Sequence, residues 1–276
     1  EARGLPSKMA TVKRLCFCVW TEAENPAIDR EAWSACQDKD YPDEILLGRR
    51  CWGGLDLSAV NDLTAFALVF EPSADDQLWR LKVWFWVPGK GLHKKADTDH
   101  VPYIAWRDAG YILTSSGEAI SKTQVIRFIY EQTEKYDLQG IAYDRNRIKD
   151  LLEFAQKEGI DLSVGEWDKE NRKWLFQGSG IKMMPFGQEA RSMTPAIDKF
   201  ELYLLERLFR HDGNPCLTWC AANAVIESDG NYRRYSKKKA IGRIDGIQAA
   251  AMAFGILEEA QLRSAYESPA AEILTF

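Results

Sequence analysis

Residues 51–70 read CWGGLDLSAVNDLTAFALVF, and this stretch decides the fold. Two runs rich in β-forming residues, WGGLDLS and LTAFALVFE, flank a polar tip, a pattern that predicts a β-hairpin. A third run, LWRLKVWFWV, follows at residues 78–87 and is closed by Pro88 and Gly89. Three consecutive strands with short connections predict an antiparallel meander at the start of a domain.

Helices and strands alternate after the meander. Ser121 can cap a helix that runs to about Tyr136, with apolar residues at helical spacing. A short strand at residues 138–143, a helix at 148–158 and a strand near 162–164 follow. This order is typical of an α/β sheet with crossover helices. We therefore expect a mixed central sheet, a meander followed by parallel strands, flanked by helices.

The rest of the chain is predicted as loops, further helices and a second hairpin. Residues 90–120 should cross the surface with one short helix. Residues 165–173 should form a polar loop, and the glycines and Pro185 should keep residues 174–190 loop-like. Three helices are expected at residues 192–209, 215–224 and 244–260. A hairpin at residues 225–235 should turn at Asp229-Gly230-Asn231.

The expected domain organisation is a leader, one domain and a tail. Residues 1–50 mix charges and prolines with a strand near 15–20 and a helix near 29–36, and should form the leader. Residues 51–262 should form the α/β domain and residues 263–276 a tail. The chain lacks an initiator Met and a G-x-x-x-x-G-K-[ST] phosphate-binding loop, which predicts a fragment of a longer protein.

Composition excludes several classes of protein. The 276 residues include 36 Lys and Arg against 41 Asp and Glu, a net charge of −5, which argues against a histone-like basic binder. The 3 histidines are scattered, so a His-rich zinc site is disfavoured. The 6 cysteines form no C-x-x-C pair and are expected to be reduced thiols. Without an apolar membrane span or a signal-peptide core, the protein should stay inside the cell that makes it.

Three acids stand out by position. Asp56 lies within an apolar strand, on the same face as Gly54, where a carboxylate is costly unless its charge is compensated. Asp144 ends a predicted parallel strand, the usual edge for sites in α/β sheets. Asp245 begins the last helix. Hard oxygen ligands projected from separate rigid elements suit a divalent metal site.

Each acid also has a purely structural interpretation. Asp245 could be a helix N-terminal acid stabilised by the helix dipole. Asp144 could be a loop acid paired with Arg145 or Arg147, and Asp56 a turn-forming or buried, paired residue. The three acids are more informative together, because a three-strand meander, a strand and helix, and a final helix follow each other in this order in an RNase H-like fold.

One segment next to Asp245 is strongly basic. Residues 233–243 read RRYSKKKAIGR, without any acid. Beside a candidate acid site, the run predicts a clamp for nucleic-acid phosphates, although a solvated basic hairpin would have the same sequence. The candidate DNA-binding residues are Arg145, Arg233, Arg234, Lys237, Lys238, Lys239 and Arg243.

Five blocks in order resemble the C-terminal nuclease domain of tailed-bacteriophage terminase large subunits. They are Gly54–Ser58 with Asn61–Ala65, Ala142–Arg145, Phe176–Gly178 with Met184-Pro185, His211–Pro215 with Trp219 and Asn223, and Arg243–Gly246 with Ala250 and Met252. The resemblance covers roughly residues 51–260. The leader, with Trp20 and Ala32-Trp33, resembles the segment that joins the motor domain to the nuclease.

The resemblance implies a metal-dependent endonuclease that cuts concatemeric double-stranded DNA during genome packaging with little sequence preference. It implies that Asp56, Asp144 and Asp245 are catalytic and that they hold two Mg²⁺ or Mn²⁺ ions, with Asp62 as an auxiliary ligand. It also implies an upstream ATPase domain, a small terminase subunit and a portal protein as partners, no membrane, and a location in the cytoplasm of the infected host cell.

Two other functions fit the same residues. A RuvC-like resolvase or an RNase H would share the metal chemistry but prefer branched DNA or RNA–DNA hybrids. A non-catalytic DNA-gripping or portal-docking module would use the basic hairpin and keep the acids for structure.

Overall fold

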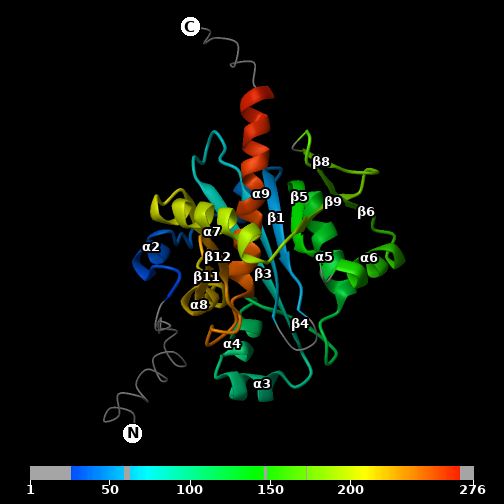
Figure 1. The fold of residues 1–276 in the computed structure, drawn as a ribbon. Helices are drawn as coiled ribbons and strands as arrows, with labels where there is room; N and C mark the ends of the chain where they lie inside the picture. The colour runs from blue at the N-terminus through cyan, green and yellow to red at the C-terminus, as the bar shows by residue number, and fades with distance from the viewer. Residues whose placement is uncertain (1–25, 59–62, 146–147, 172, 268–276) are drawn as a thin grey trace.

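An eight-stranded mixed sheet forms the centre of the protein (Figure 1), seen in a computed structural model that describes residues 26–58, 63–145, 148–171 and 173–267. The strand order is β10-β3-β2-β1-β5-β9-β6, and β4 pairs with β3. The strands are β1 (Arg50–Asp56), β2 (Thr64–Phe70), β3 (Trp79–Pro88), β4 (Leu113–Ser115), β5 (Asp137–Asp144), β6 (Leu162–Val164), β9 (Ile181–Phe186) and β10 (Phe209–His211).

The predicted meander and the parallel half of the sheet are both confirmed. Strand β1 pairs antiparallel with β2, and β2 pairs antiparallel with β3. On its other side β1 pairs parallel with β5, which pairs parallel with β9, and β9 pairs parallel with β6. The carboxyl ends of β1, β5 and β9 therefore meet at one edge of the sheet.

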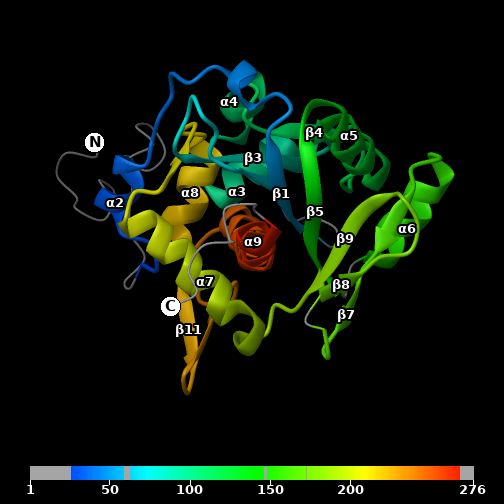
Figure 2. The same ribbon diagram turned by 90° about the horizontal axis from the view of Figure 1, so that it is seen from above.

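Helices cover both faces of the sheet (Figures 1 and 2). One apolar core lies between the sheet and α7, α8 and α9, and a second lies between the sheet and α5 and α6. In the described part of the chain no helix is long and apolar enough to span a membrane. The helices are α2 (Arg30–Ala35), the 3₁₀ helix η2 (Asp43–Leu46), α3 (Leu92–Asp99), α4 (Tyr103–Asp108), α5 (Lys122–Lys135), α6 (Ile148–Lys157), α7 (Ala190–Leu205), α8 (Pro215–Asn223) and α9 (Asp245–Glu267).

Two short hairpins lie outside the central sheet. Strands β11 (Ile226–Asp229) and β12 (Tyr232–Tyr235) form the predicted hairpin with its turn at Gly230. Strands β7 (Glu166–Asp168) and β8 (Lys173–Leu175) form a second hairpin, where a polar loop was predicted. Trp167 and Trp174 face each other across it with ring centroids 5.2 Å apart. This apolar cross-strand pair explains why the polar segment forms strands.

Several predicted boundaries are wrong. Residues 174–190 contain β9, a strand in the sheet, because pairing on both sides with β5 and β6 outweighs the glycines and Pro185. Residues 90–120 contain two helices and β4 rather than one helix. The predicted helix at 192–209 ends at Leu205, and strand β10 follows. Helix α9 continues to Glu267, beyond the predicted end of this helix at residue 260.

The described cysteines agree with the predicted reduced state. Four cysteines are buried free thiols: Cys36, Cys51, Cys216 and Cys220. The predicted strand at residues 15–20 lies outside the described residues, as do Asp62 and Arg147.

The backbones of helix α9 and strand β1 lie in direct contact, because the strand carries a glycine where the helix crosses it. A Cβ atom added to Gly54 would lie 1.9 Å from the carbonyl oxygen of Ala249 and 2.9 Å from the nitrogen of Ala253. Both alanines are fully buried, so small residues on both elements bring the backbones together. This close approach positions the start of α9 relative to the end of β1.

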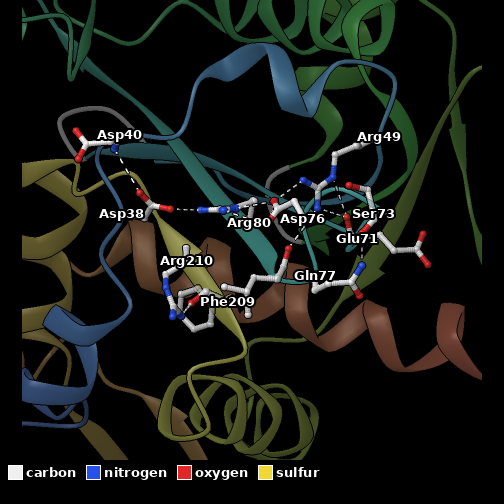
Figure 3. Close-up of polar contacts among 11 residues, drawn as sticks. Asp38, Asp40, Arg49, Glu71, Ser73, Asp76, Gln77, Arg80, Phe209 and Arg210 are labelled. Carbon is white, nitrogen blue, oxygen red and sulfur yellow. Dashed lines mark hydrogen bonds and ion pairs between the residues drawn. The ribbon is translucent and has the colours of Figure 1, made fainter.

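The leader is attached to the sheet by a partly buried ionic network (Figure 3). Arg80 on β3 donates to Asp38 at 2.6 Å and to Asp76 at 2.8 Å, and Arg49 donates to Asp76 at 2.8 Å. Burial raises the pKa of Asp76, but the two guanidinium groups outweigh it and lower that pKa to about 2. The carboxylate therefore stays ionised between Arg49 and Arg80 and holds three segments together.

A buried histidine fixes helix α2 of the leader against β10. The ring of His211 stacks on Trp33 with centroids 4.1 Å apart, and its Nε2 lies 3.1 Å from the carbonyl oxygen of Trp33. The backbone N–H of Gly213 donates to Nδ1, so the neutral ring carries its proton on Nε2. Burial lowers the pKa of His211 to about 4, and the contact therefore depends on the uncharged ring.

Candidate functional site

Asp56 and Asp245 lie on either side of one lysine ammonium group. Lys237 Nζ is 2.8 Å from Oδ2 of Asp56 and 2.6 Å from Oδ1 of Asp245. Both carboxylate side chains are 3% exposed, whereas the lysine side chain is 47% exposed. Two buried negative charges thus share one positive charge that approaches from the solvent side.

The fold explains how these two acids meet. Asp56 is the last residue of β1 and points to the same face as Gly54, as the strand alternation predicted. Helix α9 crosses this face at Gly54, and Asp245 is its first residue. The partial positive charge at a helix N-terminus also favours the carboxylate of Asp245. Asp245 is therefore both the helix N-terminal acid of the structural interpretation and a member of the candidate site.

Asp144 stands at the end of the neighbouring strand. Leu55 of β1 pairs with Tyr143 of β5 in parallel register, so the two residues that follow, Asp56 and Asp144, end adjacent strands at the same level. Within the described ranges, no group of three or more His, Cys, Asp and Glu side chains is close enough to hold one metal ion. The structure thus brings together two of the three predicted acids and places the third on the adjacent strand.

Gln188 belongs to the site and was not predicted. Its Nε2 lies 3.4 Å from Oδ1 of Asp56, the oxygen that Lys237 does not contact. Gln188 follows β9, whose carboxyl end lies at the same sheet edge as those of β1 and β5. Recognition of β9 as a parallel strand would have pointed to the residues just after it.

Arg145 and Glu189 extend the charged surface at this edge. Arg145 follows Asp144 and is 63% exposed, and its guanidinium lies 3.8 Å from the carboxylate of Glu189. A hydrogen bond from Ser192 lowers the pKa of Glu189. Arg145 therefore remains accessible from solvent beside the strand ends.

The ammonium of Lys237 is held in its charged form. Burial lowers the pKa of this group, but the charges of Asp56 and Asp245 outweigh burial and raise the pKa above its usual range. The basic run therefore contributes a charge to the acid site itself, and not only to a surface beside it.

The two carboxylates fit a divalent metal ion. Their oxygens are hard ligands of the kind that Mg²⁺ and Mn²⁺ take, and they already surround one cation, the ammonium of Lys237. They come from a strand and a helix that meet at backbone distance, which gives a rigid pair of donors. Asp144 is the next carboxylate along the sheet edge.

Most of the other basic residues of the run 233–243 are less available to bind phosphates than the sequence indicated, because acidic side chains already pair with them. Arg233 forms ion pairs with Asp198 and Glu201 of α7. Arg234 and Lys239 lie 3.4 and 3.5 Å from the carboxylate of Glu227 on the partner strand of the hairpin. The run contains no acid, but acids from α7 and β11 offset much of its charge. Lys238 is exposed to solvent.

A cavity of about 440 Å³ has Lys237, the residue that contacts both carboxylates, as part of its wall. Arg243 and His100 supply further basic groups to the wall, and Trp219 supplies an aromatic face. A Cβ atom on Gly242 would lie 2.7 Å from the rings and amide of Trp219 and Asn223, so the wall is tightly packed there. Asp99 also lines the wall, so the cavity carries charged groups of both signs.

Comparison with known proteins relates the chain to one protein family. A family model described as the endonuclease domain of the terminase large subunit matches residues 1–261. The chain is 35% identical over 257 residues to the terminase large subunit of Enterobacteria phage HK97, which covers 92% of this chain and 46% of the phage protein. Protein YmfN of Escherichia coli (strain K12) is 22% identical over 250 residues, or 86% of this chain and 50% of that protein.

A solved structure shows the same relationship in three dimensions. The crystal structure of the HK97 bacteriophage large terminase matches with a TM-score of 0.70 at 34% identity, covering 84% of this chain and 43% of that one. The chain therefore spans about half the length of the curated relatives that it matches.

Proposed function

Because the chain belongs to the family of terminase large-subunit endonuclease domains, we propose that it is a metal-dependent endonuclease that cuts concatemeric viral DNA during genome packaging. Its mixed sheet with flanking helices confirms the predicted RNase H-like fold. The observation that carries the proposal is the pair of buried carboxylates, Asp56 and Asp245, gathered around one cation at the sheet edge.

In this proposal Asp56, Asp144 and Asp245 are the catalytic acids and hold two divalent ions, Mg²⁺ or Mn²⁺. Asp56, which contacts the same ammonium group as Asp245 and ends the strand next to that of Asp144, would hold the ions together with these two acids. Asp62 is proposed as an auxiliary ligand by family resemblance alone, because it lies outside the described residues. Bound divalent ions supply an activated water and stabilise charge on the leaving oxygen.

The chain's own residues would position the DNA backbone. Arg145, which follows Asp144, and Lys238, which follows Lys237, have exposed side chains that can contact phosphates. Arg243 would add a contact from the cavity wall. Arg233, Arg234 and Lys239 would contribute only where DNA replaces their acidic partners. Phosphate contacts of this kind do not read bases, which suits cutting with little sequence preference.

The partners of the whole protein follow from the family only. We propose an ATPase domain in the same protein, and a small terminase subunit and a portal protein as assembly partners. Double-stranded DNA is the proposed substrate, and the infected host cell is the proposed location of action.

Cleavage of supercoiled plasmid with Mn²⁺ tests the proposal. Asp56→Asn should lower the rate at least about a hundredfold, because one oxygen donor and its charge are lost. Asp229→Asn, on an exposed hairpin turn, is the matched control and should cut like the wild type. Chelation of the metal should stop cleavage by both the wild type and the control.

Two results would contradict the proposal. Equal rates for the wild type and Asp56→Asn would show that the acids are structural. Faster cleavage of branched DNA or an RNA–DNA hybrid than of linear duplex, measured on one substrate panel, would assign the same site to another nuclease class.

A further inference from the structure

The position of Lys237 has a consequence for any metal ion that binds Asp56 and Asp245. Its ammonium contacts one oxygen of each carboxylate, at 2.8 and 2.6 Å. Mg²⁺ binds carboxylate oxygens at about 2.0–2.1 Å. An ion that bridged the same two oxygens would therefore occupy almost the same point as the lysine nitrogen.

Charge prevents the two cations from sharing this position. The carboxylate side chains are 3% exposed, so little water screens a divalent ion from an ammonium group beside it. One ammonium leaves the pair of carboxylates with a residual negative charge, whereas a divalent ion neutralises both. The divalent ion is therefore the better counter-ion, but it must first displace the lysine.

The structure provides a route and a destination for the displaced side chain. Lys237 lies in the turn after β12, and its side chain is 47% exposed, so it can leave without a change in the core. The cavity of about 440 Å³ beside it is lined by Lys237 together with Trp219, Arg243 and Asp99. A lysine that swings from the carboxylates to this cavity joins Arg243 as a second base for a phosphate.

We propose that Lys237 is a built-in counter-ion that occupies the metal position between Asp56 and Asp245, and that a divalent ion displaces it toward the adjoining cavity, where it can contact the DNA phosphate. The proposal rests on the proposed function, because it takes Asp56 and Asp245 as metal ligands. It adds that metal binding is in competition with a residue of the chain itself.

Metal binding by calorimetry tests this without any substrate. Lys237→Met keeps the aliphatic stem and removes the charge, and it should bind Mn²⁺ at least about tenfold more tightly than the wild type. Lys238→Met, the exposed next residue, is the matched control and should bind Mn²⁺ like the wild type. Lys237→Met should also melt at a lower temperature than the wild type without metal, and Mn²⁺ should remove this difference.

A second measurement uses the wild-type protein and does not depend on how the variant folds. Acetylation with a limiting amount of acetic anhydride, read by mass spectrometry, should modify Lys237 slowly without metal because its ammonium is held by two carboxylates. Saturating Mg²⁺ should raise the labelling rate of Lys237 severalfold and leave that of Lys238 unchanged.

The outcomes separate this proposal from the proposed function. Equal or weaker Mn²⁺ binding by Lys237→Met, or labelling of Lys237 that Mg²⁺ does not change, would overturn the counter-ion role even if Asp56-dependent cleavage is observed. Tighter binding and increased labelling would support the role even if the substrate panel favoured another nuclease class.

Discussion

Replacement of Gly54 by alanine should disturb both the stability and the activity of the protein. The added Cβ would lie 1.9 Å from the carbonyl oxygen of Ala249, and an ordinary contact begins at 3.4 Å. Helix α9 or strand β1 must therefore move by about 1.5 Å, and both contacted atoms belong to the backbone, which cannot rotate away. Overpacking of this kind costs about 1–3 kcal/mol, and we expect the upper end of that range.

The same movement shifts Asp245 relative to Asp56. A misplacement of about 1 Å can lower a reaction rate about a hundredfold. We therefore expect Gly54→Ala to lower the free energy of unfolding by about 3 kcal/mol, measured by urea denaturation. We also expect a fall in Mn²⁺-dependent plasmid cleavage of about two orders of magnitude, measured at a temperature where the variant is fully folded.

Gly53→Ala is the matched control, because Gly53 is the next residue of the same strand but faces the other core. Its added Cβ would meet only side-chain atoms, of Ile141 at 3.0 Å, Phe66 at 3.1 Å and Leu68 at 3.4 Å. These side chains can give way, so we expect a loss of about 1 kcal/mol or less and near-normal cleavage. If Gly54→Ala were as stable and as active as Gly53→Ala, the close approach of α9 to β1 would not be what positions the site.

Two further predictions concern the leader. The pKa of His211 is about 4 in the folded protein and about 6.5 in the unfolded chain, so the unfolded chain takes up the proton first as the pH falls. The contribution of His211 to the free energy of unfolding is therefore complete above about pH 6.5. The free energy of unfolding should fall by about 3 kcal/mol as the pH drops toward 4. Urea denaturation across this range should show the slope for the wild type and a smaller one for His211→Gln, and equal slopes would exclude His211 as the cause. Asp76→Asn leaves Arg49 and Arg80 without their shared carboxylate and should lower the free energy of unfolding by about 3 kcal/mol. Asp75→Asn, at the exposed neighbouring residue, is the control and should change the free energy of unfolding by less than about 0.5 kcal/mol. Equal losses in the two variants would show that the ionic network contributes little to stability.

Local sequence patterns were sufficient for most of the fold. The meander from β1 to β3, the capped helix α5 and the hairpin of β11 and β12 all carry their signals within a few residues. Strand β9 does not, because its burial is partial and its strand conformation comes from β5 and β6 on either side. Strand β10 is three residues long and is fixed by pairing with β3, far away in the sequence.

The candidate site shows the same division. Asp56 and Asp245 could be singled out because a carboxylate in an apolar strand and one at a helix start are local anomalies. The place of Lys237 between them could not, because Lys237 and Asp56 are 181 positions apart and no local pattern distinguishes this lysine from its two neighbours. The partners of Arg233 are on α7, 35 and 32 positions earlier in the sequence, and no local pattern indicated them either.

The sequence distance between Asp56 and α9 also sets the time at which the site can first exist. A ribosome adds about 5–20 residues per second, so Asp245 is made about ten seconds or more after Asp56. A growing chain that has been made as far as β5 carries Asp56 and Asp144 but lacks both Lys237 and the helix that covers Gly54. The proposed nuclease is therefore inert until Asp245 and helix α9 have been made, because the order of its segments along the chain places the last acid of the site far behind the first.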